Sequence, residues 1–287
     1  MILINPIDVT NFTTNVLENE YSAYVAGTTY AVGNRVIVAS EHNVYESLVD
    51  SNIGNTPSTS PTKWALVGKT NAYKCIDDKV SSQTVNATSI VMEFSTLKAT
   101  SIGFLNVECE SIKVEVIDGI ETLFTETRRG FTRDVSTYFN WFFNTSTYQD
   151  FFYFVTPFCP TAKFKITLTG TSCKVGVMVA GISIDIGCTL WDSGIGFIDY
   201  SKKVEDEWGE VYLQEGNFKK TFRGSCAIET SKLSTVLNAL IARRGKTTLY
   251  IPSDRYSMSI FGYASEPDIV WQNPVKSIYN IDITGVI

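Results

Sequence analysis

Residues 163–168 read Lys-Phe-Lys-Ile-Thr-Leu, and residues 113–117 read Lys-Val-Glu-Val-Ile. In both segments, apolar and polar side chains alternate with a period of two, as they do in a β-strand that buries one of its faces. Similar β-branched segments at residues 89–94 and 277–283 are separated by stretches rich in Gly, Asn, Asp and Ser. The sequence therefore predicts a mainly β protein.

One segment has the period of a helix instead. Its apolar side chains follow the i, i+3, i+4, i+7, i+8 spacing of an amphipathic helix: Leu233, Val236, Leu237, Leu240 and Ile241. Thr230 or Ser231 can cap its start, and Gly245 can end it. We expect one helix at about 231–244. Because its charges lie only near its ends, we expect it to cover a sheet.

Composition disfavours several classes of function. The 287 residues carry a formal charge of −6, whereas a nucleic-acid partner requires a basic surface. The chain contains one histidine, His42, so a multi-histidine metal site is excluded and a catalytic triad would depend on that single ring. We therefore expect no catalytic residue, no metal, no cofactor and no nucleic-acid partner.

The six cysteines stand far apart in the sequence, with no CxxC pair, and we expect them to be mostly buried free thiols. Residues 1–17 lack the basic start and long apolar region of a signal peptide. The longest weakly charged apolar run, residues 175–187, contains Asp185 and is too short to cross a bilayer. These features predict cytoplasmic synthesis without membrane insertion.

Shifts in composition divide the chain into four parts. Residues 50–62 form a turn-rich loop, residues 68–71 resemble a hinge, and a further unit begins near Cys188. We expect an extended N-terminal arm at 1–17, a small unit at 18–68, a β-sandwich at 69–187 and a β-rich α+β domain with the helix at 188–287. The arm shows no partner within its own chain, which predicts that it docks onto a neighbouring subunit.

The small unit (residues 18–68) has a characteristic order of aromatic and turn residues. Residues 30–36 fit Tyr-x-x-Gly-x-x-Val, Tyr45 lies on a second strand, and residues 57–64 close with Ser-Pro-x-x-Trp. This order resembles the chitin-binding-type carbohydrate modules. In that family, exposed aromatic rings stack on sugars, so the resemblance implies Tyr24, Tyr30, Tyr45 and Trp64 as glycan-binding candidates. The alternative is that the unit is purely architectural.

The resemblance continues beyond the small unit. Residues 71–84 fit an Asn-x-Tyr-x-x-x-Asp-x-Lys-Val-Ser-x-Gln-Thr segment that is similar to one in bacteriophage tail proteins. The strands that follow, up to about residue 187, resemble a galactose-binding-type jelly roll. Residues 198–206, 242–251 and 275–285 are similar to parts of a unit in tail-tip proteins.

This order of segments implies a structural component of a phage tail. It would be a distal tail, tail-tip or adaptor protein in the virion, made in the cytoplasm of the bacterial host. Its implied partners are copies of itself, other tail proteins and host cell-surface polysaccharide. The main alternative is a stand-alone glycan-binding protein. A glycoside hydrolase, which needs two carboxylates and no histidine, is less favoured, because nothing places two carboxylates across a cleft.

An aromatic block occupies residues 138–154, where ten of seventeen residues are aromatic and Asp150 is the only charge. Adjacent aromatic residues on a strand point to opposite faces. Either both faces are buried within the chain, or one contacts a neighbouring subunit; a sugar-stacking platform is a third possibility. The candidates for subunit contact are Tyr138, Trp141, Phe142, Phe151, Phe152 and Phe154.

Overall fold

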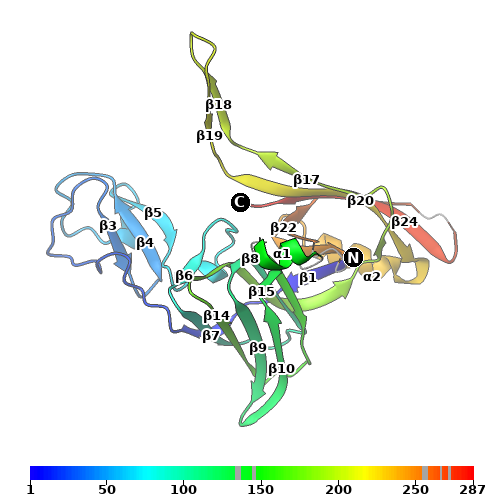
Figure 1. Cartoon of the computed structure of the whole chain (residues 1–287). Coiled ribbons are helices and arrows are strands. Elements are labelled where there is room, and N and C mark those ends of the chain that lie inside the picture. The colour runs from blue at the N-terminus through cyan, green and yellow to red at the C-terminus, as the bar shows by residue number, and fades with distance from the viewer. Residues whose placement is uncertain (133–136, 144–146, 254–257, 266, 271–272) are drawn as a thin grey trace.

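The computed structural model describes residues 1–132, 137–143, 147–253, 258–265, 267–270 and 273–287. Its described elements, in chain order, are β1 (Ile2–Pro6), β2 (Thr10–Thr14), β3 (Arg35–Val38), β4 (Asn43–Ser47), η1 (Pro57–Thr59), β5 (Trp64–Lys69), η2 (Lys74–Ile76), β6 (Thr84–Asn86), β7 (Ser89–Ser95), β8 (Ser101–Glu108), β9 (Ser111–Asp118), β10 (Glu121–Arg129), β11 (Phe131–Thr132), α1 (Tyr138–Phe143), β12 (Thr147–Tyr148), β13 (Phe151–Val155), β14 (Lys163–Thr169), β15 (Cys173–Asp185), β16 (Cys188–Thr189), β17 (Gly194–Asp199), β18 (Lys202–Glu205), β19 (Val211–Gln214), β20 (Phe218–Glu229), η3 (Thr230–Lys232), α2 (Leu233–Ala242), β21 (Thr248–Ser253), β22 (Met258–Ala264), β23 (Asp268–Val270) and β24 (Lys276–Gly285). The prediction of a mainly β protein is confirmed (Figure 1).

A β-sandwich forms the centre of the molecule. The five-stranded sheet β10-β9-β14-β7-β2 packs against the part of a twelve-stranded sheet that contains β13, β8 and β15. The two segments with period two lie side by side, because Ile166 of β14 pairs with Val114 of β9 and with Met92 of β7. All three side chains are buried. The alternation in the sequence therefore gave the buried face of this sheet correctly.

The N-terminal strand β1 is an internal strand of the twelve-stranded sheet. It pairs antiparallel with β15 on one side and with β21 on the other. Leu3 and Ile4 point to opposite faces, join two different hydrophobic clusters and have no exposed surface. The expectation that residues 1–17 dock onto a neighbour is therefore wrong, since β1 is paired within its own chain and β2 pairs with β7.

The same sheet continues into the C-terminal third of the chain. From β1 it passes through β21, β22, β24 and β20, so it is continuous across residues 187–188, where the sequence suggests a boundary. Helix α2 covers this part, as predicted, and buries Val236 and Leu240 against it, whereas Ile241 of the predicted apolar stripe is exposed. The expectation that Thr230 or Ser231 caps the helix is wrong, because both belong to the 3₁₀ turn η3 that precedes it and the N-cap residue, Lys232, makes no side-chain cap. Gly245 has a φ of 68°, the left-handed conformation expected after a helix end.

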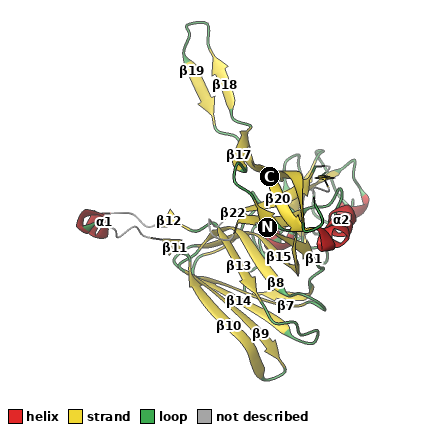
Figure 2. Ribbon diagram, turned by 90° about the vertical axis from the view of Figure 1, so that its right-hand side faces the viewer, coloured by secondary structure: helices red, strands yellow, loops and turns green. Residues whose placement is uncertain are grey.

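Three parts project from this body. The small unit contains the three-stranded sheet β3-β4-β5 and lies to the left in Figure 1. The hairpin β18–β19 extends away from the sheet, and α1 is carried outward beyond the short pair β11–β12 (Figure 2). None of the helices in the described part of the chain has the length and apolar character needed to cross a membrane.

Candidate functional site

The four aromatic candidates of the small unit pack together. Tyr30 and Trp64 meet edge to face with ring centroids 5.2 Å apart, and Tyr24 lies within 6.0 Å of both rings. Trp64 is 2% exposed, and its indole N–H donates to the Asn55 carbonyl at 2.9 Å. Tyr45 belongs to the same buried cluster and donates to the Glu41 carboxylate at 2.7 Å.

These rings form the core of the small unit. Tyr30, Tyr45 and Trp64 are buried, and Tyr24 is half-buried. The small unit has few other apolar side chains to fill its interior, so the rings carry its packing. The expectation that they present exposed faces to a sugar is therefore corrected for Tyr30, Tyr45 and Trp64.

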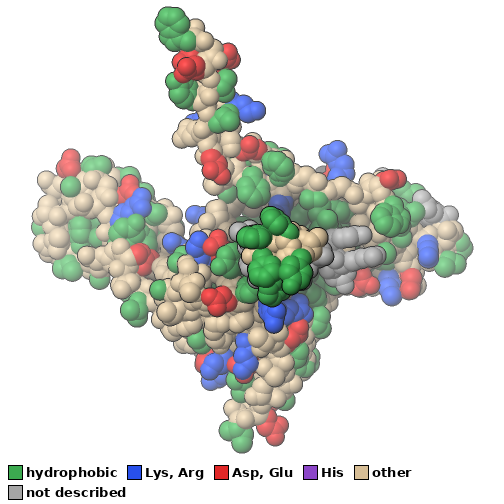
Figure 3. All heavy atoms as spheres, in the orientation of Figure 1, with side chains coloured by type: hydrophobic (Ala, Val, Ile, Leu, Met, Phe, Trp, Pro, Cys, Tyr) green, Lys and Arg blue, Asp and Glu red, His purple; other side chains and the backbone are tan. Residues whose placement is uncertain are grey.

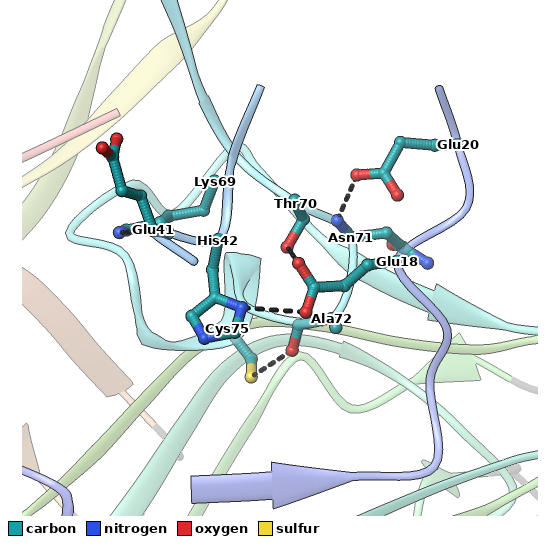
Figure 4. Close-up of polar contacts among 9 residues, drawn as sticks. All are labelled: Glu18, Glu20, Glu41, His42, Lys69, Thr70, Asn71, Ala72 and Cys75. Carbon is teal, nitrogen blue, oxygen red and sulfur yellow. Dashed lines mark hydrogen bonds and ion pairs between the residues drawn. The ribbon is translucent and has the colours of Figure 1, made fainter. Parts of the chain in front are cut away.

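A polar cluster joins the small unit to the sandwich (Figure 4). The Glu18 carboxylate binds the His42 Nδ1 atom at 2.8 Å and accepts a hydrogen bond from the Thr70 hydroxyl at 2.8 Å. The imidazole of His42 stacks on the ring of Tyr73. These contacts connect the β3–β4 turn to the segments that enter and leave the small unit, so they fix its orientation.

Beside this junction lies a cavity of about 210 Å³, which we call the basic cleft. Its basic side chains come from β3, β5, η2 and the turn after η2, and its apolar wall comes from β4 and β5. Among the residues that line it are Arg35, Lys69, Lys74, Lys79, Val44 and Val67. The acidic side chains at the cleft are Glu20 and Asp77.

The four basic side chains of the cleft differ in their partners. Arg35 forms an ion pair with Glu46 at 2.7 Å, and the hydrogen bonds that its guanidinium donates to the Tyr21 hydroxyl and the Glu46 carboxylate raise its pKa. The Lys69 ammonium donates to the Glu41 carbonyl at 3.2 Å. In the described part of the chain, neither Lys74 nor Lys79 forms an ion pair with a carboxylate. The cleft therefore holds positive charge that its own carboxylates do not pair.

The aromatic block divides into an exposed part and a buried part. Tyr138, Trp141 and Phe142 lie on α1, no residue of which is buried. Figure 3 shows hydrophobic side chains gathered over α1, in the middle of the face turned to the viewer. Their candidacy for subunit contact remains open.

The remaining three candidates lie inside the protein. Phe151, Phe152 and Phe154 belong to β13, and all three are buried by their own chain. The reason is that both faces of β13 are covered: Phe152 and Phe154 enter the sandwich core, and Phe151 enters the cluster that contains Ile4. The expectation that they contact a subunit is corrected.

Sequence reasoning did not single out the hairpin β18–β19. All eight residues of its two strands are exposed, including Val204, Val211 and Leu213. Its turn carries Trp208, which is 89% exposed. The signal in the sequence is the Trp-Gly turn between two short segments, Lys-Lys-Val-Glu and Val-Tyr-Leu-Gln.

The cysteines are all free thiols: Cys75, Cys109, Cys173 and Cys226 are buried, Cys159 is half-buried and Cys188 is exposed. Burial raises the pKa of Cys75 and of Cys109 to about 12, which keeps both thiols protonated and weakly nucleophilic near neutral pH. Among the residues that the structure describes, no three His, Cys, Asp or Glu side chains are grouped so that they could hold a metal ion.

Comparisons of the chain with protein-family models, with curated proteins and with solved structures found no match. The function is therefore inferred from the surface of the molecule and from the sequence resemblances described above.

Proposed function

We propose that this chain is a structural protein of a bacteriophage tail, in the distal tail, the tail tip or an adaptor, that assembles with copies of itself and with other tail proteins in the virion. It acts by binding and not by catalysis. The observation that carries the proposal is the concentration of exposed apolar side chains on two elements, α1 and the hairpin β18–β19, that project from a well-packed body.

Both projecting elements need a partner for physical reasons. A two-stranded hairpin is at best marginally stable in water, and a six-residue helix is far too short to be stable alone. Exposed clusters of aromatic residues are typical of protein interfaces, where burial removes them from water. Contact with other subunits would bury the exposed apolar side chains of both elements and so stabilise them.

The sequence resemblances support the choice of a phage tail as the assembly. In this proposal, residues 69–187 are a galactose-binding-like jelly roll and residues 188–287 are a tail-tip-like α+β domain. The small unit acts mainly as an architectural module, because three of its four candidate rings are buried. Contact with host cell-surface polysaccharide is a secondary part of the proposal and rests on the resemblance alone.

The proposal is tested by the mass and symmetry of the purified chain. Light scattering and class averages of particle images should give one oligomer, with a mass that is a multiple of 31.9 kDa. Replacement of Tyr138 and Phe142 by Ser should lower the fraction of oligomer. The matched control is Ile120→Ser, which removes a fully exposed apolar side chain from an ordinary turn and should change nothing.

A monomer at every concentration that binds no phage tail would contradict the proposal. If that monomer also bound a polysaccharide tightly, the stand-alone glycan-binding protein would be the better interpretation. Turnover of a glycan that vanished on removal of one carboxylate would instead indicate a hydrolase.

A further inference from the structure

The turn of the hairpin β18–β19 forms a compact acidic tip, defined as residues 205–210, Glu-Asp-Glu-Trp-Gly-Glu. Four of its six residues are acidic, and in the described part of the chain none of them forms an ion pair. The tip lies at the far end of the hairpin, at the top of Figure 3. It therefore presents unpaired negative charge at the point farthest from the body.

Hydrogen bonds shape the backbone of the turn that carries Trp208. The Asp206 carboxylate accepts hydrogen bonds from the backbone N–H groups of Trp208 and Glu210, at 2.9 Å each. The Gly209 N–H donates to the Asp206 carbonyl, and Gly209 has a φ of 80°. Trp is among the residues most enriched in the strong contacts of interfaces, so the exposed Trp208 is suited to be an anchor.

The basic cleft has the opposite charge and a suitable lining. Four basic side chains face it against two acidic ones, Glu20 and Asp77. Val67 and the ring of Tyr21, which also line the cleft, add exposed apolar surface that an indole can cover. An ammonium group over the face of Trp is also favourable, so Lys74 or Lys79 can bind the indole as well as a carboxylate.

The tip and the cleft do not meet within one chain. In Figure 1 the hairpin and the small unit stand apart, and no described residue of the tip contacts the cleft through a hydrogen bond or ion pair. A second copy can supply both missing partners at once, because each copy carries one tip and one cleft.

We propose that the acidic tip of one copy docks into the basic cleft of a second copy, with Trp208 as the apolar anchor. The proposal deepens the proposed function and rests on it, since it assigns one contact of the self-assembly. Such a contact joins two different surfaces, so it continues from copy to copy and forms a ring if the rotation between neighbours closes.

Charge reversal in the full chain tests the contact. The tip variant is Glu207→Lys with Glu210→Lys, and the cleft variant is Lys74→Glu with Lys79→Glu. Each should weaken self-association at least tenfold in sedimentation at 50 mM salt, and the wild-type contact should weaken as salt rises. The chain that carries all four changes should self-associate more strongly than either double variant, because Lys at 207 and 210 can then pair with Glu at 74 and 79.

Mixing the variants gives a sharper result. The tip variant keeps its cleft, and the cleft variant keeps its tip, so an equal mixture has one working contact per pair. We expect the mixture to form heterodimers and nothing larger through this contact. The control replaces two exposed lysines on the sandwich, Lys98→Glu with Lys163→Glu. It changes the net charge by the same amount as the cleft variant does, and it should leave the mass of the oligomer unchanged.

Several outcomes would overturn the contact. If an oligomer keeps its mass in both variants, the docking is wrong while the proposed assembly stands; if the wild type is always a monomer, both are wrong. A four-change chain that associates no more strongly than the double variants, with an unchanged circular dichroism spectrum and melting temperature, also overturns it. So would binding of polygalacturonate that is lost only in the cleft variant while the oligomer persists, because the cleft would then be a site for acidic glycans.

Discussion

The imidazole ring of His42 lies nearly parallel to the ring of Tyr73, with their centroids 3.6 Å apart and an angle of 15° between the planes. His42 belongs to the β3–β4 turn of the small unit, and Tyr73 precedes η2 on the sandwich side. The only histidine of the sequence is thus placed at the junction between two parts of the molecule, where the Glu18 carboxylate holds it.

Replacement of His42 by Asn tests this junction. His42 has a φ of 54°, and Asn tolerates that backbone conformation, so the variant removes the stack and the Glu18 contact without adding strain. We expect a loss of roughly 1–2 kcal/mol of local stability. Hydrogen exchange of residues 67–73 should become several-fold faster. Glu18→Gln, which keeps an acceptor oxygen, should have a smaller effect; equal protection in all three proteins would contradict the role of the stack.

Trp64 supports the small unit from inside. Trp64→Ala removes the largest ring of its core and the hydrogen bond to Asn55, and should destabilise the unit by about 3–5 kcal/mol. Limited proteolysis should then cut within residues 18–68 first. Leu66→Ala on the same strand is the matched control, because Leu66 is exposed and should change stability by less than about 0.5 kcal/mol. A Trp64→Ala protein as resistant as wild type would refute this assignment.

The internal position of β1 predicts a large effect from small changes near the N-terminus. Leu3→Ala and Ile4→Ala should each cost about 2–5 kcal/mol in urea unfolding, because each empties space in a different buried cluster. Asp8→Asn, at an exposed position just after the strand, should leave the transition within about 0.5 kcal/mol. Wild-type stability in both alanine variants would mean that β1 is not part of the sheet in solution.

The thiols give a prediction about reactivity and pH. Iodoacetamide should label exposed Cys188 in the native protein and should reach Cys75 and Cys109 only after unfolding, as read by peptide mass spectrometry. The pKa of both buried thiols rises from an ordinary 9.0 to about 12 in the folded state. As pH rises above 9, the unfolded chain ionises first, so the free energy of unfolding is retained below pH 9 and falls between pH 9 and about 12.

Cys75→Ala provides the control for the pH effect. Its stability should decrease less steeply above pH 9 than that of the wild type, because one of the two groups is gone. Rapid native labelling of Cys75 at pH 8 would show that the thiol is accessible and would contradict its burial.

Much of the fold could be predicted from local pattern, because local pattern reports which face of an element is buried. Phe164, Ile166 and Leu168 alternate in the sequence and are all buried on one face of β14. The spacing of Val236 and Leu240 likewise indicated the covered face of α2. In both cases, the spacing of apolar residues a few positions apart is enough to indicate which face is buried.

Features that depend on distant parts of the chain could not be predicted in the same way. Leu3 and Ile4 looked unpartnered because their strand pairs with β15 and β21, which lie far along the sequence. Trp64 would give the same sequence signal whether its ring were buried or exposed. The exposure of Trp208 at the hairpin tip could not be predicted, because a local pattern does not show whether a distant part of the chain covers a side chain.

The position of β1 also sets an order of events during synthesis. Residues 2–6 leave the ribosome long before their second neighbour, β21, which begins at residue 248. Until then, one edge of the first strand has nothing to pair with, and the C-terminal half of the twelve-stranded sheet cannot be completed. Ribosome-bound chains that end before residue 248 will therefore leave β1 without its second neighbour, and the joining of the two halves of the sheet is a late event.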